Sequence, residues 1–252
     1  MRRHAIALAA AIGFAASAGR SDAQTLGQRV DAVRDGIVLM TFQARPGVCG
    51  GSNGSIWTRD SWNAGSRNQN TCVTGPVRVS LGRADGATIS VRVVVGGAWR
   101  ASASETDLGV VSPTDAAHYL TGIAHSIGGR SGNDAVSAAA LSDAPDTSPD
   151  LVSLVRDASA PLDARKQALF WAGNTSLATR DLVSLYDGLG PFSLREHFVF
   201  VISQRRDDAA VDKLIDVARR DKDLEIRKQA MYWLGQTQDP RAVKFLRDLV
   251  TR

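Results

Sequence analysis

The chain has 252 residues, a mass of 26.8 kDa and 44% hydrophobic residues, the composition of an ordinary globular protein with one or two domains. This composition excludes a chain disordered throughout, a collagen and a disulfide-dense mini-protein. The formal net charge is +4, and the sequence contains only four His and two Cys. Because these residues supply most metal and thiol chemistry, the composition does not indicate an enzyme.

The first segment, residues 1–23, is typical of a secretory signal peptide. MRRH is basic, residues 5–18 are apolar apart from one serine, and SDA at residues 21–23 offers small residues for cleavage. The apolar run, about 14 residues, is shorter than the ~20 needed to span a membrane. We therefore expect cleavage near Ala23, a periplasmic or secreted protein and no membrane span. Cleavage would remove three Arg and one Asp and lower the net charge from +4 to +2, so no nucleic-acid partner is expected.

Residues 24–110 predict a small α+β module. Leu26, Val30 and Val33 share one helical face, and residues 37–42 are a continuous apolar run typical of a strand. Residues 77–81 and 89–95 alternate apolar and polar side chains around a DG turn at residues 85–86, which predicts a β-hairpin. The apolar face of this hairpin must be covered, and the first helix and the cysteine loop are the nearest candidates.

Two cysteines, Cys49 and Cys72, bracket a loop rich in Gly, Asn and Ser. In an exported chain an even cysteine count indicates one disulfide. The alternative, a metal or catalytic thiol site, lacks the paired CxxC spacing of zinc sites. Within the loop, Asp60 lies between Trp57 and Trp62, which favours either packing over the disulfide or a site for a sugar or cationic ligand.

From residue 111 to 252 the pattern becomes helical and repeats. SP at 112–113, SP at 148–149 and DP at 239–240 are typical helix starts. The string RKQALFWAG at 165–173 recurs with few changes as RKQAMYWLG at 227–235. Half-way between them lies a more divergent copy, REHFVFVI at 195–202, and a fainter copy is AVSAAAL at 135–141. Each copy is followed by a second amphipathic helix, so the sequence predicts helix pairs of about 30 residues stacked in a solenoid.

These strings resemble HEAT repeats, in the short variety also found in phycobilin-lyase-like proteins. The resemblance rests on Asp163 with residues 165–173, on Asp223 with residues 227–235, and on DPRAV at 239–243. The middle copy departs from the pattern, because Phe198 stands where Ala is usual and no Gly ends the copy. The resemblance implies an α-solenoid, a scaffold or adaptor function, and partner docking on the second helix of each pair. The predicted fold class is therefore α+β, a disulfide-linked hairpin and helix module followed by an all-α HEAT-like solenoid.

The shared arginine of each copy lies on the stripe predicted to be buried. The resemblance implies that these arginines form a structural ladder with aspartates or carbonyl groups of neighbouring units. The ladder residues are Arg165, Arg195 and Arg227, with Asp163, Asp208, Asp223 and Asp239 as candidate partners.

One and five positions after that arginine, a charge and an aromatic ring recur in every copy. These residues are Lys166 and Phe170, Glu196 and Phe200, and Lys228 and Tyr232. Because aromatic residues are enriched in protein interfaces, we expect this column to bind another protein, the alternative being that the rings pack against adjacent repeats.

No catalytic, metal or cofactor site is predicted. His118 and His125 are seven residues apart, whereas metal-binding pairs on helices lie at i and i+3 or i+4. GGSNGS at 50–55 lacks the GK[ST] of a phosphate-binding loop, and no GxSxG or HExxH motif is present. The favoured function is an exported, non-enzymatic protein-binding scaffold. The alternatives are a lyase-like or chromophore-handling protein and an envelope ligand-binding module centred on residues 49–72.

Overall fold

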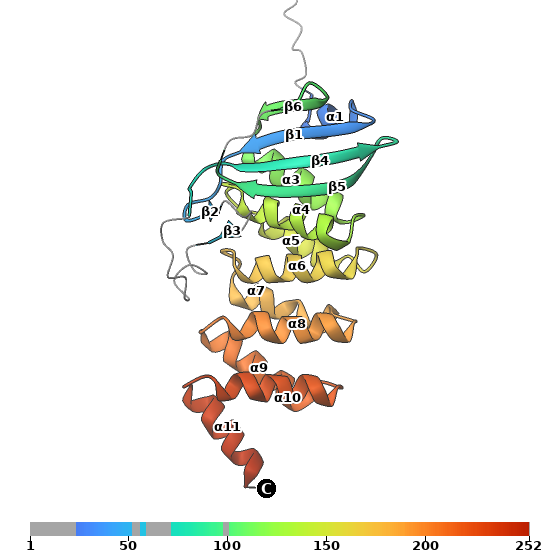
Figure 1. The fold of residues 1–252 in the computed structure, drawn as a ribbon. Coiled ribbons are helices and arrows are strands. Elements are labelled where there is room, and N and C mark those ends of the chain that lie inside the picture. Colours follow the sequence, from blue (N-terminus) through green and yellow to red (C-terminus); the bar gives the residue numbers. More distant parts are fainter. Residues whose placement is uncertain (1–23, 52–55, 59–71, 98–100, 252) are drawn as a thin grey trace, which may run out of the picture.

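The computed structural model describes residues 24–51, 56–58, 72–97 and 101–251. It is an α+β protein, in which a mixed four-stranded sheet lies across one end of a stack of helices (Figure 1). The predicted fold class is therefore confirmed. The predicted signal peptide, residues 1–23, lies outside the described residues, as do Asp60 and Trp62.

The sheet has the strand order β5-β4-β1-β6. β1 (Gly36–Phe42) pairs antiparallel with β4 (Val77–Ala84), which forms a hairpin with β5 (Ala87–Val95). Asp85 and Gly86 both have positive φ, 51° and 79°, as a two-residue type I′ turn requires. The strand and hairpin predicted from the alternating pattern are confirmed, and so is the first helix, α1 (Leu26–Asp31), with Thr25 and Gln28 in a capping box.

The fourth strand, β6 (Glu105–Val110), was not predicted. It pairs parallel with β1 at the sheet edge, and its alternation is obscured because most of its side chains are exposed and Gly109 adopts a φ of 70°. A parallel edge strand of this kind is held by a neighbour distant in sequence, which local pattern cannot reveal.

The apolar face of the sheet packs mainly against α4 (Gly129–Leu141), which contacts β5 and β4. The main cover is therefore not one of the two candidates, the first helix and the cysteine loop: α1 contacts α3 (Pro113–Ala124), and in the described part of the loop β2 contacts β5. Val77, Val79 and Leu81 are fully buried in the same hydrophobic cluster as the helices. The boundary predicted between residues 110 and 111 falls between β6 and α3, yet the hydrophobic core runs continuously across it.

The remaining helices continue the stack below α4 (Figure 1). They are α5 (Ser148–Arg156), α6 (Leu162–Gly173), α7 (Thr179–Ser184) with a 3-10 turn (Tyr186–Gly188), α8 (Phe192–Ser203), α9 (Asp208–Arg220), α10 (Leu224–Gly235) and α11 (Pro240–Val250).

The sequence copies are the helices α4, α6, α8 and α10, which stack directly on one another. The closest pairs are α3 with α4, α5 with α6, and α9 with α10. Three copies, α4, α6 and α10, are therefore the second helix of these pairs. A helix also follows each copy, as the sequence predicts, but for these three the closer partner is the helix before. The irregular copy at α8 is a helix like the others, with Phe198 fully buried against Tyr186 at a ring distance of 4.9 Å.

The predicted disulfide between Cys49 and Cys72 is confirmed. Cys49 begins β2 (Cys49–Gly50), which pairs with β3 (Ile56–Trp57) on one side and bridges to Val73 on the other. A Cβ atom at Gly50 would lie 2.2 Å from the carbonyl oxygen of Val95 in β5, so only glycine allows this approach. The disulfide and Gly50 together hold the cysteine loop against the end of the sheet.

Candidate protein-binding face

The predicted charge and aromatic column lies on the outward side of α6, α8 and α10. Tyr232 is 60% exposed, Lys228 is also exposed, and the other four column residues are half-buried. The corresponding positions of α4 carry Val136 and Ala140, which are buried in the core shared with the sheet. The column is thus open on three helices and covered on the fourth.

A second apolar column, which was not predicted, lies at the first residue of the same three helices. Leu162, Phe192 and Leu224 are 41%, 43% and 52% exposed. They precede the charged residues by four positions, so each helix presents an apolar, a charged and an aromatic residue in line along one side. We call this surface the docking face. It comprises Leu162, Lys166, Phe170, Phe192, Glu196, Phe200, Leu224, Lys228 and Tyr232.

Tryptophans next to the aromatic column join the rings of adjacent helices. Phe170 contacts Trp171 edge-on at 5.4 Å, and Phe200 of α8 lies 5.8 Å from Trp233 of α10. Trp233 also stacks edge-on against Tyr232 at 5.3 Å. The tryptophan side of the column therefore packs between repeats, while Tyr232 remains exposed.

Phe170 and Phe200 of the aromatic column, together with Trp171, line a groove of about 630 Å³. Ile56 and Thr58 of the cysteine loop line the same groove. The other lining residues come from α4, β5 and the carboxyl ends of α6 and α8: Val93, Asp134, Ser137, Leu141, Asn174 and Gln204. The two regions singled out in the sequence, the cysteine loop and the repeat column, thus meet at one surface feature.

Asp134 is the acidic group of this groove. Burial raises the pKa of its carboxyl above the ordinary value, opposed by the charges of Arg130 and Arg92. Trp171, which also lines the groove, makes a cation–π contact with Arg45, whose guanidinium lies 5.4 Å from the centroid of the Trp171 ring.

The three shared arginines lie at the inner side of their helices, and they bond in different ways. Arg165 donates to the carbonyl oxygen of Val155 at 3.0 Å, and Arg227 donates to the carbonyl oxygen of Asp221 at 2.6 Å. Arg195 alone reaches carboxylates of the next unit, those of Asp221 at 3.2 Å and of Asp223. Of the three shared arginines, only Arg195 therefore links successive units through aspartate.

The other candidate aspartates have other partners. Asp163 accepts a hydrogen bond from the backbone N–H of Gly129 in α4. Asp239 caps α11 and pairs with Arg241, whose hydrogen bonds lower the pKa of this carboxyl to about 2. Asp208 also pairs with Arg241, at 2.8 Å. Units are therefore connected by several different polar contacts and not by one repeated ladder.

Comparison with protein families finds a match to the carboxyl-terminal part of this stack. Residues 179–252 match the family model of HEAT repeats. The match begins at the first residue of α7, so α3 to α6 and the sheet lie outside it. No curated protein and no solved structure matches the chain. Within the described residues no helix is long and apolar enough to cross a membrane.

A buried polar cluster, which sequence reasoning missed, joins the segments around α8 and α9 within the matched region. Asp221, 4% exposed at its side chain, accepts hydrogen bonds from the Tyr186 hydroxyl and from the Arg195 guanidinium. Burial and the hydrogen bond to Asp221 both raise the pKa of Tyr186. Lys213 lies over the Tyr186 ring at 4.6 Å. The cluster could not be read from sequence, because Asp221 lies outside the copied string.

The two helical histidines flagged in the sequence pair with aspartates of the next unit. His118 lies 3.2 Å from Asp150, and His125 lies 2.6 Å from Asp157. Hydrogen bonds from Ser159 and His125 lower the pKa of Asp157 below its ordinary range. Among the described residues no group of three or more His, Cys, Asp or Glu side chains could hold a metal ion.

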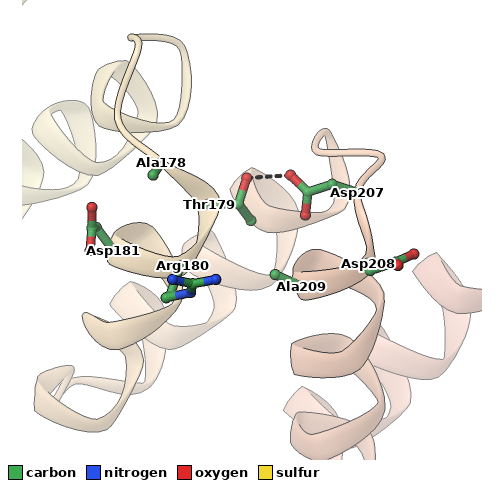
Figure 2. Close-up of a pocket in the computed structure, with 7 residues that line it drawn as sticks. All are labelled: Ala178, Thr179, Arg180, Asp181, Asp207, Asp208 and Ala209. Carbon is green, nitrogen blue, oxygen red and sulfur yellow. Dashed lines mark hydrogen bonds between the residues drawn. The ribbon is translucent and has the colours of Figure 1, made fainter.

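A hollow of about 640 Å³ opens between the starts of α7 and α9 in the HEAT repeats (Figure 2). Its acidic residue Asp207 caps α9 through the backbone N–H of Ala210 and accepts a hydrogen bond from the Thr179 hydroxyl. Asp208, at its rim, is bound by Arg241. These carboxylates already serve the contact between repeats, so we assign no ligand to the hollow.

His197 in α8 occupies the position that Ser137 has in α4. There Ser137 accepts hydrogen bonds from Gln167 and Trp171 at 2.8 and 3.2 Å. The equivalents of those donors are Gln229 and Trp233. Each of these three residues has a buried atom without a hydrogen-bond partner among the described residues: His197 Nε2, Gln229 Oε1 and Trp233 Nε1.

Acid should therefore destabilise the protein through His197. Burial, and then the charge of Lys166, lower the pKa of this histidine from 6.5. Below pH 6.5 the unfolded chain binds a proton that the folded protein resists, so the free energy of unfolding falls as the pH drops. We expect His197→Gln to reduce this loss between about pH 7.5 and about pH 5, measured by urea denaturation. The exposed His118→Gln should keep it, and equal acid sensitivity of all three proteins would contradict the assignment.

Proposed function

We propose that the chain is an exported, non-enzymatic scaffold or adaptor that binds another protein through its docking face. HEAT repeats generally mediate protein binding, and residues 179–252 contribute two of the three helices of that face. Export accords with the disulfide, because disulfides persist mainly in oxidising compartments. The periplasm is the compartment we propose.

The observation that carries this proposal is the exposure of large apolar side chains in register on successive helices. Leu162, Phe192, Leu224 and Tyr232 are each between 41% and 60% exposed. Single exposed apolar residues are common, but contiguous patches on a soluble protein mark interaction sites. Rings already fixed by packing, such as Phe200 against Trp233, lose little conformational freedom on binding.

The non-enzymatic part of the proposal rests on how the described histidines are used. His118 and His125 are paired with aspartates of the neighbouring unit, and His197 is buried between two helices. None of them lies in the groove under the cysteine loop. The groove offers an apolar lining and side-chain amides, which suit binding of a peptide segment.

The proposal is tested by affinity capture from an envelope extract with quantitative mass spectrometry. We expect Phe170→Ala/Tyr232→Ala to lose the partners that the wild-type protein captures, because truncating interface aromatics commonly costs over ~2 kcal/mol of binding free energy. The matched control is Val110→Ala, an 83% exposed apolar residue on β6, far from the face. Unchanged partners in the double variant, with thermal melting unchanged, would reject the docking face.

A further inference from the structure

The central column of the docking face alternates in charge. Lys166, Glu196 and Lys228 occupy equivalent positions on α6, α8 and α10, so the sign runs plus, minus, plus along the stack. At a rise of about 1.5 Å per residue, an apolar column lies about 6 Å away on either side, four residues before and four residues after. The face is therefore a line of alternating charges between two apolar margins.

The first two charges are available to a partner. Within the described residues neither Lys166 nor Glu196 forms an ion pair, although they stand on adjacent helices and both are partly exposed. Lys228 lies 2.8 Å from Glu225, but both side chains are more than half exposed, at 57% and 67%. Exposed pairs of this kind are weak and can exchange partners.

The spacing of the charges selects the conformation of the partner. Stacked helices lie about 8–10 Å apart, so successive charges are separated by roughly that distance. In an extended strand, at about 3.3 Å per residue, that is three residues, and an odd spacing would place successive side chains on opposite faces. In a helix, at about 1.5 Å per residue, the upper end of this range, about 10 Å, is close to seven residues, which returns to the same face after two turns.

We propose that the docking face binds an amphipathic helix of a partner protein that runs along the stack, across α6, α8 and α10. This helix carries an acidic residue at i, a basic residue at i+7 and an acidic residue at i+14, with apolar residues on both sides of that line. The apolar side chains meet the outer columns, Leu162 to Leu224 and Phe170 to Tyr232. The inference rests on the proposed function, because it specifies the partner of the same face.

The test uses two synthetic helical peptides of about 21 residues with identical composition and net charge. The matched peptide carries Glu, Lys and Glu at i, i+7 and i+14, and the control peptide carries Lys, Glu and Glu at those positions. In either direction along the stack, the control peptide places two of its three charges against like charges. We expect the matched peptide to bind at least about tenfold more tightly in fluorescence anisotropy, with a smaller ratio at high salt.

The variant Glu196→Lys makes the column uniformly positive, so each peptide then makes two favourable contacts and one unfavourable contact. The preference should disappear in this variant while thermal melting is unchanged. Equal binding of both peptides to the wild-type protein, or no binding of either, would overturn the charge register. Neither result would decide the proposed function, which the capture experiment tests with natural partners.

Discussion

Asp221→Ala should lower the free energy of unfolding by about 3–5 kcal/mol, because it leaves the buried guanidinium of Arg195 short of its partner. The side chains of Arg195 and Asp221 are 6% and 4% exposed, and Tyr186 loses the acceptor of its hydroxyl as well. Arg195 keeps Asp223 and the carbonyl oxygen of Gly190, so we expect a destabilised but folded protein. Urea denaturation followed by circular dichroism measures the change.

The matched control for this substitution is Asp187→Ala. Asp187 is 85% exposed and lies 3.3 Å from Lys213, close to the same cluster. An exposed ion pair of this kind contributes less than about 1 kcal/mol, so the control should differ little from the wild-type protein. Similar losses in the two variants would show that the burial of Asp221 adds nothing to the strength of its contacts with Tyr186 and Arg195.

Removal of the disulfide is the second large effect that we expect. Cys49→Ser/Cys72→Ser opens a loop with a sequence separation of 23 and should destabilise the fold by about 3 kcal/mol in the chain-entropy model. Because Ile56 and Thr58 line the groove, the variant should also weaken partner capture.

Thermal melting with and without reductant measures the disulfide effect. Reductant should lower the melting temperature of the wild-type protein and leave the double serine variant unchanged. If reductant leaves the melting temperature of the wild-type protein unchanged although both cysteines are shown to be reduced, then Gly50 and the sheet contacts are sufficient to hold the loop.

The parts of the fold that could be predicted from the sequence are those with local periodicity. The hairpin of β4 and β5 was visible in period-two alternation and in its DG turn, and the helix stack was visible in the copied strings. The parts that could not be predicted depend on contacts between distant segments. β6 pairs with a strand nearly 70 residues earlier in sequence. The helix that covers the hairpin is α4, which could not be predicted because the apolar pattern of a strand does not specify which element packs against it.

The docking face was predicted in part for a similar reason. The charged and aromatic residues of the column were predicted because they follow the shared arginine of each copy at fixed positions. Leu162, Phe192 and Leu224 were not predicted, because they precede that arginine. The residues at a helix start are expected to cap the helix, and an apolar residue at such a position is ordinarily assigned to the hydrophobic core. Their exposed fractions were needed to recognise a column. The groove needed β3 as well, whose position beside α6 and α8 follows from the disulfide and Gly50.

The packing of the sheet on α4 closes one end of the helix stack, while the other end has no such cover in the described residues. A helix pair stacked before α3 and α4 would need the surface of α4 that β5 and β4 occupy. Related chains that gained or lost repeats could therefore have done so only after α4, at positions such as the turn before α9. Repeat number could vary at the carboxyl-terminal side while the groove beneath the cysteine loop keeps its geometry.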